Sequence, residues 1–303
     1  MRAVFLGTPA AAVPSLRALH GFAEVELVVT RPDRPRGRSG RPQTSEVGAA
    51  AADLGIPVSH PETAGDLQSE LAAVGTFDVA LVVAYGMLIR PGALGLPTGV
   101  FVNVHFSILP RWRGAAPVQR AILAGDSTSG VTLMRIDAGL DTGAILATTA
   151  TRIGSREDAA GLTTRLAHLG ARLVTDWLPA ATDGRIAPIE QDDDDATIAA
   201  KLRSEERWID VKDTSQQVVA AVRGLSPWPG AWVRHRSGGV RILDAEMGSA
   251  PLAPGDLVLE SASLLMGTGN GSVRLVTVQP EGKRAMAAAD WARGLRDSAE
   301  GVS

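Results

Sequence analysis

Three polar residues near the middle of the chain have types and a spacing that could serve catalysis. Asn103 and His105 lie in a short apolar run, and side chains at i and i+2 of a strand point to the same face. Asp141 lies between Gly139 and Gly143, which are typical turn positions. An amide and an imidazole can donate to an oxyanion, and a carboxylate can orient the imidazole or accept a proton. Spacing alone still allows a structural histidine and a plain turn aspartate.

The segment from Phe106 to Pro117, which follows His105, is predicted to be an ordered loop. Its sequence, FSILPRWRGAAP, has two prolines, one glycine and several bulky apolar side chains, which neither a helix nor a strand favours. Loops of this kind line pockets more often than they merely connect elements. A packed surface loop anchored by Trp112 is the alternative.

The elements that would position these residues alternate between strand and helix. Apolar patterns predict strands at 2–6, 25–29, 77–84, 100–104 and 130–136, and helices at 11–19, 45–54, 117–123 and 157–178. This alternation is typical of an α/β domain with a mostly parallel sheet, whose ligands bind beyond the carboxyl ends of the strands. The site is therefore expected just after Thr30, Ala84 or His105. The first turn, GTPAAA, has one glycine where a dinucleotide fingerprint has three, which argues against a bound pyrophosphate.

The pattern changes after Gly184. Four acids at 192–195 are expected to form a solvated turn that opens a short helix reaching about Arg203, because negative charge suits a helix N-terminus. Another helix is predicted at 214–223. Short runs broken by turn residues then predict strands at 231–235, 240–244, 255–259, 264–267 and 273–279, which suggest a small β-barrel. We expect a Rossmann-like domain at 1–190, a linker at 191–206 and an OB-like barrel domain at 207–303.

Composition limits the classes of function. The 303 residues are 45% hydrophobic, enough for two domains with apolar cores, and include no cysteine, which excludes disulfides and thiolate sites. The five histidines are dispersed, and we expect no metal. The net charge is −3, so a nucleic-acid partner would need a local basic patch. No run approaches the roughly 18 apolar residues of a membrane helix, and the amino terminus lacks a signal peptide's apolar region, so we expect a cytoplasmic protein.

The central block closely resembles the methionyl-tRNA formyltransferase family. NVHFSILPRWRGAAPVQRAILAGD and GVTLMRIDAGLDTGAIL match its Asn-x-His, its Leu-Pro loop, its Arg-x-Arg-Gly-x-x-Pro and its Asp-x-Gly-x-Asp-x-Gly. FLGTPAAAVPSLRAL is similar to the family's first strand and helix, TRPDRPRGR to its tRNA-contacting loop, VVAYGMLI to its pteridine-binding segment, and RGLSPWPGAWV to the start of its C-terminal domain. The central block alone would fit any 10-formyltetrahydrofolate transferase. The Arg-rich loop and the C-terminal domain favour the tRNA enzyme.

The resemblance implies an enzyme that transfers the formyl group of 10-formyltetrahydrofolate to the α-amine of initiator methionyl-tRNA, in support of translation initiation. We expect the enzyme to be monomeric and to need no metal. It assigns catalysis to Asn103, a protonated His105 and Asp141. It implies that folate is bound by Tyr85, Gly86, Met87, Leu88 and Ile89 on one side and by Ser107, Ile108, Leu109 and Pro110 on the other. It implies that tRNA contacts Arg34, Arg36, Arg38 and Arg41 in the basic loop, and we add Arg223, Arg234 and Lys283 in the second domain.

Two departures from the family pattern flank His105. Phe106 stands where the family usually has glycine, and we expect its ring to lie beside His105 and reshape the pocket edge. Ile108 replaces leucine, which is conservative. The segment 43–46, after the basic loop, is less basic than the family leads us to expect.

Three alternatives stay open. A formyltransferase on the same core could act on a sugar nucleotide or a glycinamide ribotide, although the basic loop and the C-terminal domain argue against it. A serine hydrolase would use Ser107 as nucleophile, His105 as base and Asp141 as acid, but the chain has no G-x-S-x-G elbow. The third is a non-catalytic tRNA-binding module, which the intact Asn, His and Asp motifs disfavour.

Overall fold

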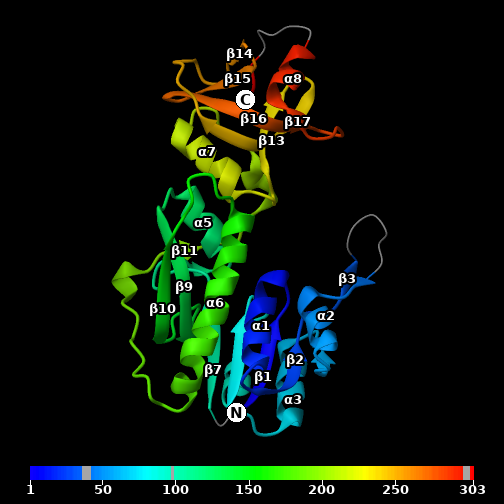
Figure 1. The fold of residues 1–303 in the computed structure, drawn as a ribbon, viewed down its shortest axis with the longest axis vertical. Coiled ribbons are helices and arrows are strands. Elements are labelled where there is room, and N and C mark those ends of the chain that lie inside the picture. The colour runs from blue at the N-terminus through cyan, green and yellow to red at the C-terminus, as the bar shows by residue number, and fades with distance from the viewer. Residues whose placement is uncertain (36–41, 97–98, 296–300) are drawn as a thin grey trace. The chain divides into compact units, whose positions relative to one another are not determined.

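The computed structural model describes residues 1–35, 42–96, 99–295 and 301–303 (Figure 1). The chain forms two units. The first contains Met1–Gly114, Ser129–Thr151 and Thr163–Ile198, and the second contains Ala115–Thr128, Arg152–Leu162 and Ala199–Ser303. The chain therefore passes between the units more than once, and its last crossing, between 198 and 199, falls in the segment that we predicted as a linker.

A seven-stranded sheet forms the centre of the first unit, in the order β10-β9-β7-β6-β1-β2-β5. Its strands are β1 (Arg2–Gly7), β2 (Glu24–Val29), β5 (Val58–Ser59), β6 (Val79–Val83), β7 (Val100–His105), β9 (Thr128–Arg135) and β10 (Ile145–Arg152). β5, β2, β1, β6 and β7 are parallel, and β9 is antiparallel to β7. The predicted α/β class is confirmed. Every residue of β6 is buried, as its continuous apolar run indicated.

The α-helices of this unit are α1 (Val13–His20), α2 (Glu46–Asp53), α3 (Ala64–Val74), α4 (Pro91–Leu94) and α6 (Ala159–Thr182), of which residues 159–162 belong to the second unit. Its shorter elements are η1 (Ala10–Ala12), β3 (Arg34–Pro35), β4 (Pro42–Gln43), β8 (Arg113–Gly114), η2 (Asp193–Asp195) and β11 (Ile198–Ala199). α2 begins where the Ser45 side chain accepts a hydrogen bond from Gly48 N, a standard N-cap. Within the described parts of the chain, no helix is both long and apolar enough to cross a membrane.

The direction of strand addition reverses at β1, which pairs with β2 on one side and with β6 on the other. In open α/β sheets, ligands bind at such a switch point, beyond the carboxyl ends of the strands. Thr8 joins these ends, because its Oγ1 donates to Tyr85 O and accepts from Arg31 N, each at 3.3 Å. β7 is the neighbour of β6, so His105 lies on the same edge of the sheet.

The second unit has an antiparallel sheet in the order β12-β13-β16-β15-β14, with β17 paired to β16. Its strands are β12 (Ala231–His235), β13 (Gly238–Met247), β14 (Leu257–Glu260), β15 (Ser263–Thr268), β16 (Gly271–Pro280) and β17 (Met286–Ala287). Its helices are α5 (Pro117–Leu123), η3 (Ser204–Arg207), α7 (Ser215–Gly224) and α8 (Ala288–Arg293). The predicted antiparallel β domain is confirmed. Among the described strands the sheet is an open path with β12 and β14 at its ends.

The prediction of a short helix that reaches Arg203 is wrong. The acids form the single 3-10 turn η2, and the chain then extends into β11. Asp192 accepts a hydrogen bond from Asp194 N at 3.0 Å, so its side chain stabilises a local turn rather than an α-helix.

Candidate active site

Asn103 and His105 lie at the carboxyl end of β7, on the edge of the sheet that carries the switch point. Asn103 is paired with Val82 on β6, and His105 with Thr132 on β9. Val104, which lies between them, packs against α6, so Asn103 and His105 share the opposite face of the sheet. His105 is buried and Asn103 is half-buried. The predicted side-by-side placement follows from this strand geometry.

The imidazole of His105 lies between two acceptors. Nε2 lies 2.9 Å from the carbonyl oxygen of Trp112, and because a carbonyl only accepts, Nε2 is the donor. Nδ1 lies 3.6 Å from Asp141 Oδ2, which is an ion-pair distance but longer than a hydrogen bond. A ligand atom can therefore approach Nδ1 and the carboxylate together while Nε2 is held by the protein.

Asp141 reaches this position from the turn between β9 and β10. Its φ is +52°, in the left-handed region that residues other than glycine rarely adopt. Its Oδ2 accepts a 2.8 Å hydrogen bond from Gly114 N, and its carbonyl oxygen accepts a 2.9 Å hydrogen bond from Gln191 Nε2. Two segments distant in sequence therefore fix both the backbone and the carboxylate of Asp141.

The loop from Phe106 to Pro117 is ordered by hydrogen bonds within itself and to β9. Ser107 Oγ donates to Arg111 O at 2.6 Å, and Ser107 O accepts from Thr132 Oγ1 at 2.8 Å. Ser107 is buried, and its hydroxyl is bonded to a backbone carbonyl instead of His105. This geometry removes the nucleophile that the serine hydrolase alternative required.

The expectation that the Phe106 ring lies beside His105 is wrong. A Cβ added at Gly170 of α6 would lie 2.7 Å from Val104 Cγ1 and 3.8 Å from Phe106 Cε1. The ring is therefore on the Val104 side of the sheet, under α6, and is only 9% exposed. The reason is the two-residue alternation of side chains, which continues past the end of β7.

The loop 85–89, which we expected to bind folate, follows β6 at the switch point. Tyr85 and Ile89 are buried, whereas Gly86 and Leu88 are exposed, Leu88 by 73%. Burial raises the pKa of the Tyr85 phenol to about 12. On the other expected wall, Ile108 and Pro110 are half-buried, and Ser107 and Leu109 are buried.

Comparison with known proteins identifies the family. The formyl transferase family matches residues 1–178, and the formyl transferase C-terminal domain matches residues 201–296. The methionyl-tRNA formyltransferase of Thermobifida fusca is 43% identical over 304 residues, which cover 98% of this chain and 97% of that protein. That of Cereibacter sphaeroides is 40% identical over 297 residues, covering 97% and 96%. The chain belongs to the methionyl-tRNA formyltransferase family.

A solved structure shows the same fold. It is the N-formyltransferase from Helicobacter canadensis in complex with folinic acid and dTDP-3-aminofucose, with a TM-score of 0.71 and 16% identity. The match covers 90% of this chain and 98% of that one. At this identity the likeness concerns the fold alone, while membership of the methionyl-tRNA formyltransferase family makes this chain a folate-dependent formyltransferase.

The basic loop expected in a methionyl-tRNA formyltransferase is described only in part. Arg36, Arg38 and Arg41 lie outside the described residues. The backbone of Arg34 is described, in β3, where it pairs with Gln43 of β4.

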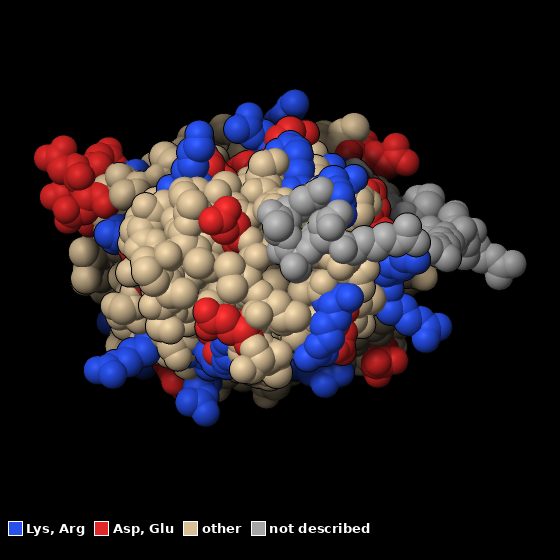
Figure 2. Space-filling view, turned by 90° about the horizontal axis from the view of Figure 1, so that it is seen from above, with Lys and Arg blue, Asp and Glu red and all other residues tan. Residues whose placement is uncertain are grey.

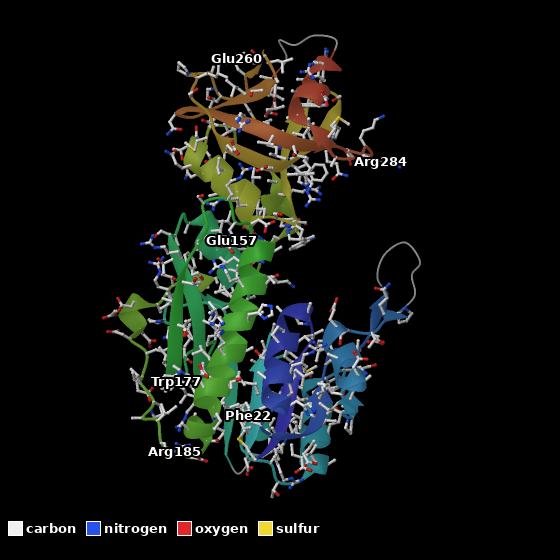
Figure 3. All side chains as sticks on the ribbon, in the orientation of Figure 1. Phe22, Glu157, Trp177, Arg185, Glu260 and Arg284 are labelled. Carbon is white, nitrogen blue, oxygen red and sulfur yellow. The ribbon has the colours of Figure 1, made fainter. Side chains whose placement is uncertain are left out.

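The basic residues expected to meet tRNA in the second unit have different surroundings. Arg234 is exposed on β12, with its guanidinium 4.1 Å from the centre of the Trp208 ring. Lys283 is exposed in the turn between β16 and β17, next to Arg284 (Figure 3). Arg223 is half-buried, and burial lowers the pKa of its guanidinium.

Arg223 also lines a cavity of about 310 Å³ in the second unit. Glu157 (labelled in Figure 3), Asp158 and Asp244 line the same cavity, and Arg223 Nη1 donates to Gly154 O at 3.1 Å. On the face shown in Figure 2, basic and acidic side chains are interspersed around a largely uncharged centre. Arg234 and Lys283 are thus exposed, whereas Arg223 is half-buried.

Sequence reasoning missed Gln191 and gave Arg113 no role beyond its motif. Gln191 lies in the segment predicted as a linker, and its spacing from Asp141 carries no periodic signal. Arg113 belongs to the Arg-x-Arg-Gly motif given above. Its side chain is only 7% exposed, and this burial, which the sequence does not show, indicates a structural role.

Proposed function

We propose that Asn103, His105 and Asp141 transfer the formyl group of 10-formyltetrahydrofolate to the α-amine of initiator methionyl-tRNA. Family membership makes the chain a methionyl-tRNA formyltransferase in activity. The observation that carries the residue assignment is the approach of His105 Nδ1 to Asp141 Oδ2 on the ligand-binding edge of the sheet. The product, formylated initiator tRNA, is used by ribosomes in translation initiation, so we also propose a cytoplasmic location.

In the proposed reaction, the amine nitrogen attacks the formyl carbon and a new C–N bond forms. The formyl oxygen then carries negative charge, and the former bond between the formyl carbon and N10 breaks as N10 takes a proton. The amine loses a proton in the same sequence. Asp141, whose Oδ2 is oriented by Gly114 N, is placed to accept that proton directly or through one water.

Asn103 and His105 supply the donors for the developing oxyanion. Among the described residues, the Asn103 side chain has no hydrogen-bond partner that would compete with a ligand, and it shares a face with the imidazole. Nδ1 is the ring nitrogen directed toward the reacting atoms, because Nε2 is bonded to Trp112 O. Each such donor is typically worth about 3 kcal/mol in the transition state.

The loop 85–89 and the segment 107–110 are proposed to hold the folate. The first follows β6 at the switch point, next to the strand that carries His105, which is where the formyl group must be presented. Leu88 offers an exposed apolar surface for a flat ring, and the neighbouring backbone offers donors and acceptors for its polar edge. Ile108 and Pro110, each half-buried, would contact the opposite side.

The tRNA is proposed to contact Arg34, Arg36, Arg38 and Arg41 in the first unit and Arg234 and Lys283 in the second. We propose only an indirect role for Arg223, because its side chain is half-buried and its Nη1 already donates to Gly154 O. Phosphate contacts of this kind give affinity that falls with salt.

The test is an acceptor comparison with the purified chain and 10-formyltetrahydrofolate. We expect formyl-methionine on initiator methionyl-tRNA, and little product from elongator methionyl-tRNA, an amino-sugar nucleotide or glycinamide ribotide. Preferential formylation of the sugar nucleotide or the ribotide would overturn the proposal. If calorimetry detected no folate binding, the alternative of a non-catalytic tRNA-binding module would be favoured instead.

A further inference from the structure

The segment 189–197, which we call the bracing segment, connects the two loops that face His105. At its start, Ile189 and Ile145 exchange backbone hydrogen bonds of 2.7 and 2.9 Å beside the Asp141 turn. At its end, Thr197 accepts from Arg113 N at 2.8 Å through its carbonyl and from Trp112 N at 2.9 Å through its hydroxyl. Both loops contain a left-handed residue that is not glycine, namely Asp141 and Trp112.

Gln191 is the residue of this segment that reaches the Asp141 turn. Its Nε2 donates to Asp141 O at 2.9 Å and to Gly143 O at 2.7 Å. A primary amide has two N–H donors, so both are used on the turn that presents the catalytic carboxylate. This pair of bonds holds the backbone on either side of Thr142.

Arg113 sets the orientation of the Gln191 amide. Its Nε donates to Gln191 Oε1 at 2.9 Å, and its Nη1 donates to Asp193 Oδ1 at 2.8 Å. A guanidinium only donates, so the oxygen of the amide must face Arg113 and the NH₂ must face the turn. The next residue, Gly114, donates from its backbone N to Asp141 Oδ2.

We propose that Gln191 is a positioning residue for Asp141, and that Arg113 and Asp193 hold Gln191 in place. The inference rests on the proposed catalytic role of Asp141. It gives Asp193, the second acid of the run at 192–195, a function other than solvation, since Asp193 completes the support of Arg113. It also gives the predicted linker a role in the chemistry of the first unit.

The reason is geometric. Asp141 lies in a backbone conformation that L-residues seldom adopt, so contacts from outside the turn must hold it. A carboxylate that must stand next to Nδ1 of His105 tolerates little displacement, because an error of 1 Å in a reacting geometry can cost about a hundredfold in rate. Loss of the Gln191 donors would release the turn without touching either substrate.

The experiment compares Gln191→Glu and Gln191→Met with Glu190→Gln. Gln191→Glu keeps the size and the Arg113 contact but has no N–H donor, Gln191→Met has neither polar group, and Glu190→Gln changes an exposed neighbour. We expect both Gln191 variants to lose about tenfold to a hundredfold in kcat, with KM for folate and for tRNA within about twofold of the parent. Glu190→Gln should match the parent, and thermal unfolding of all three is measured beside the kinetics.

A double-mutant cycle separates positioning from a general structural effect. If Gln191 acts through Asp141, the double variant with Asp141→Asn and Gln191→Met should have a single-turnover rate within about twofold of that of Asp141→Asn alone. The positioning role would be overturned if the rate losses of the two single variants multiplied in full in the double variant. It would also be overturned if the rate of a Gln191 variant fell only in proportion to its folded fraction at the assay temperature. Normal turnover of Asp141→Asn alone would instead remove the catalytic assignment, and the positioning role with it.

Discussion

His105 Nδ1 and Asp141 Oδ2 lie 3.6 Å apart, although one residue ends β7 and the other lies in the turn that follows β9. Their approach depends on the antiparallel pairing of β7 with β9, which places His105 opposite Thr132. The chain runs on from Thr132 through the rest of β9 into the Asp141 turn. The acid and the imidazole therefore meet on the ligand edge of a sheet that is otherwise parallel.

Loss of either group should abolish most of the activity without unfolding the chain. We expect His105→Ala and Asp141→Asn each to lower kcat by about a hundredfold to a thousandfold, which corresponds to roughly 3 to 4 kcal/mol of transition-state stabilisation. Asp176→Asn, an exposed carboxylate-to-amide change on α6, is the matched control. Formylation kinetics with thermal unfolding measure both effects, and near-normal turnover of either site variant contradicts the assignment.

Tyr85 is the single tyrosine of the chain, so its ionisation can be followed directly by tyrosinate absorbance. Burial raises the pKa of Tyr85 from 10.0 to about 12, so the folded protein should ionise near pH 12 and the urea-unfolded protein near pH 10. Tyr85→Phe is the blank for both titrations. A midpoint near pH 10 in the folded chain would contradict the buried loop.

The same shift links stability to pH. Below pH 10 both states keep the phenol proton, and the stability that burial confers is fully present. Above it the unfolded state ionises first, so stability is lost as pH rises toward about 12, by at most roughly 3 kcal/mol. Urea unfolding of the parent and of Tyr85→Phe across this range should show a steeper fall in the parent.

Phe106 should behave as a core residue. Its ring packs under α6 near Gly170, so Phe106→Ala should reduce the free energy of unfolding by about 3 kcal/mol, and Phe106→Leu by less. At a temperature where both variants are folded, kcat/KM should stay close to the parent value. A changed KM for folate with unchanged stability would show instead that the ring borders the pocket.

The basic loop should act through charge. Replacing Arg36 and Arg38 together by alanine is expected to raise KM for tRNA and to reduce the slope of log affinity against log salt by about one for each phosphate that the loop no longer neutralises. Arg185→Ala is the control, because this exposed arginine pairs with Asp183 instead. If both quantities match the parent, the loop does not contact tRNA.

Local patterns in the sequence determined the elements and the candidate site. The apolar run of β6, the alanine-rich run that predicted a helix at 45–54 and the i, i+2 spacing of Asn103 and His105 each act over a few residues, so each could be predicted without a fold. The same locality explains the failure at 192–203, where the turn formed by the aspartate side chains prevailed over helix formation.

Only the tertiary structure decided how distant segments meet. Adjacency in sequence suggested that Phe106 borders His105, but strand alternation and the space beside Gly170 place the ring on the other face. No periodic pattern connects Gln191 to Asp141, because a contact across fifty residues depends on strand pairing and chain path and not on local preference. The sequence thus proposed Asn103, His105 and Asp141 as the catalytic groups, while packing decided how closely the acid approaches the imidazole and what holds that acid in place.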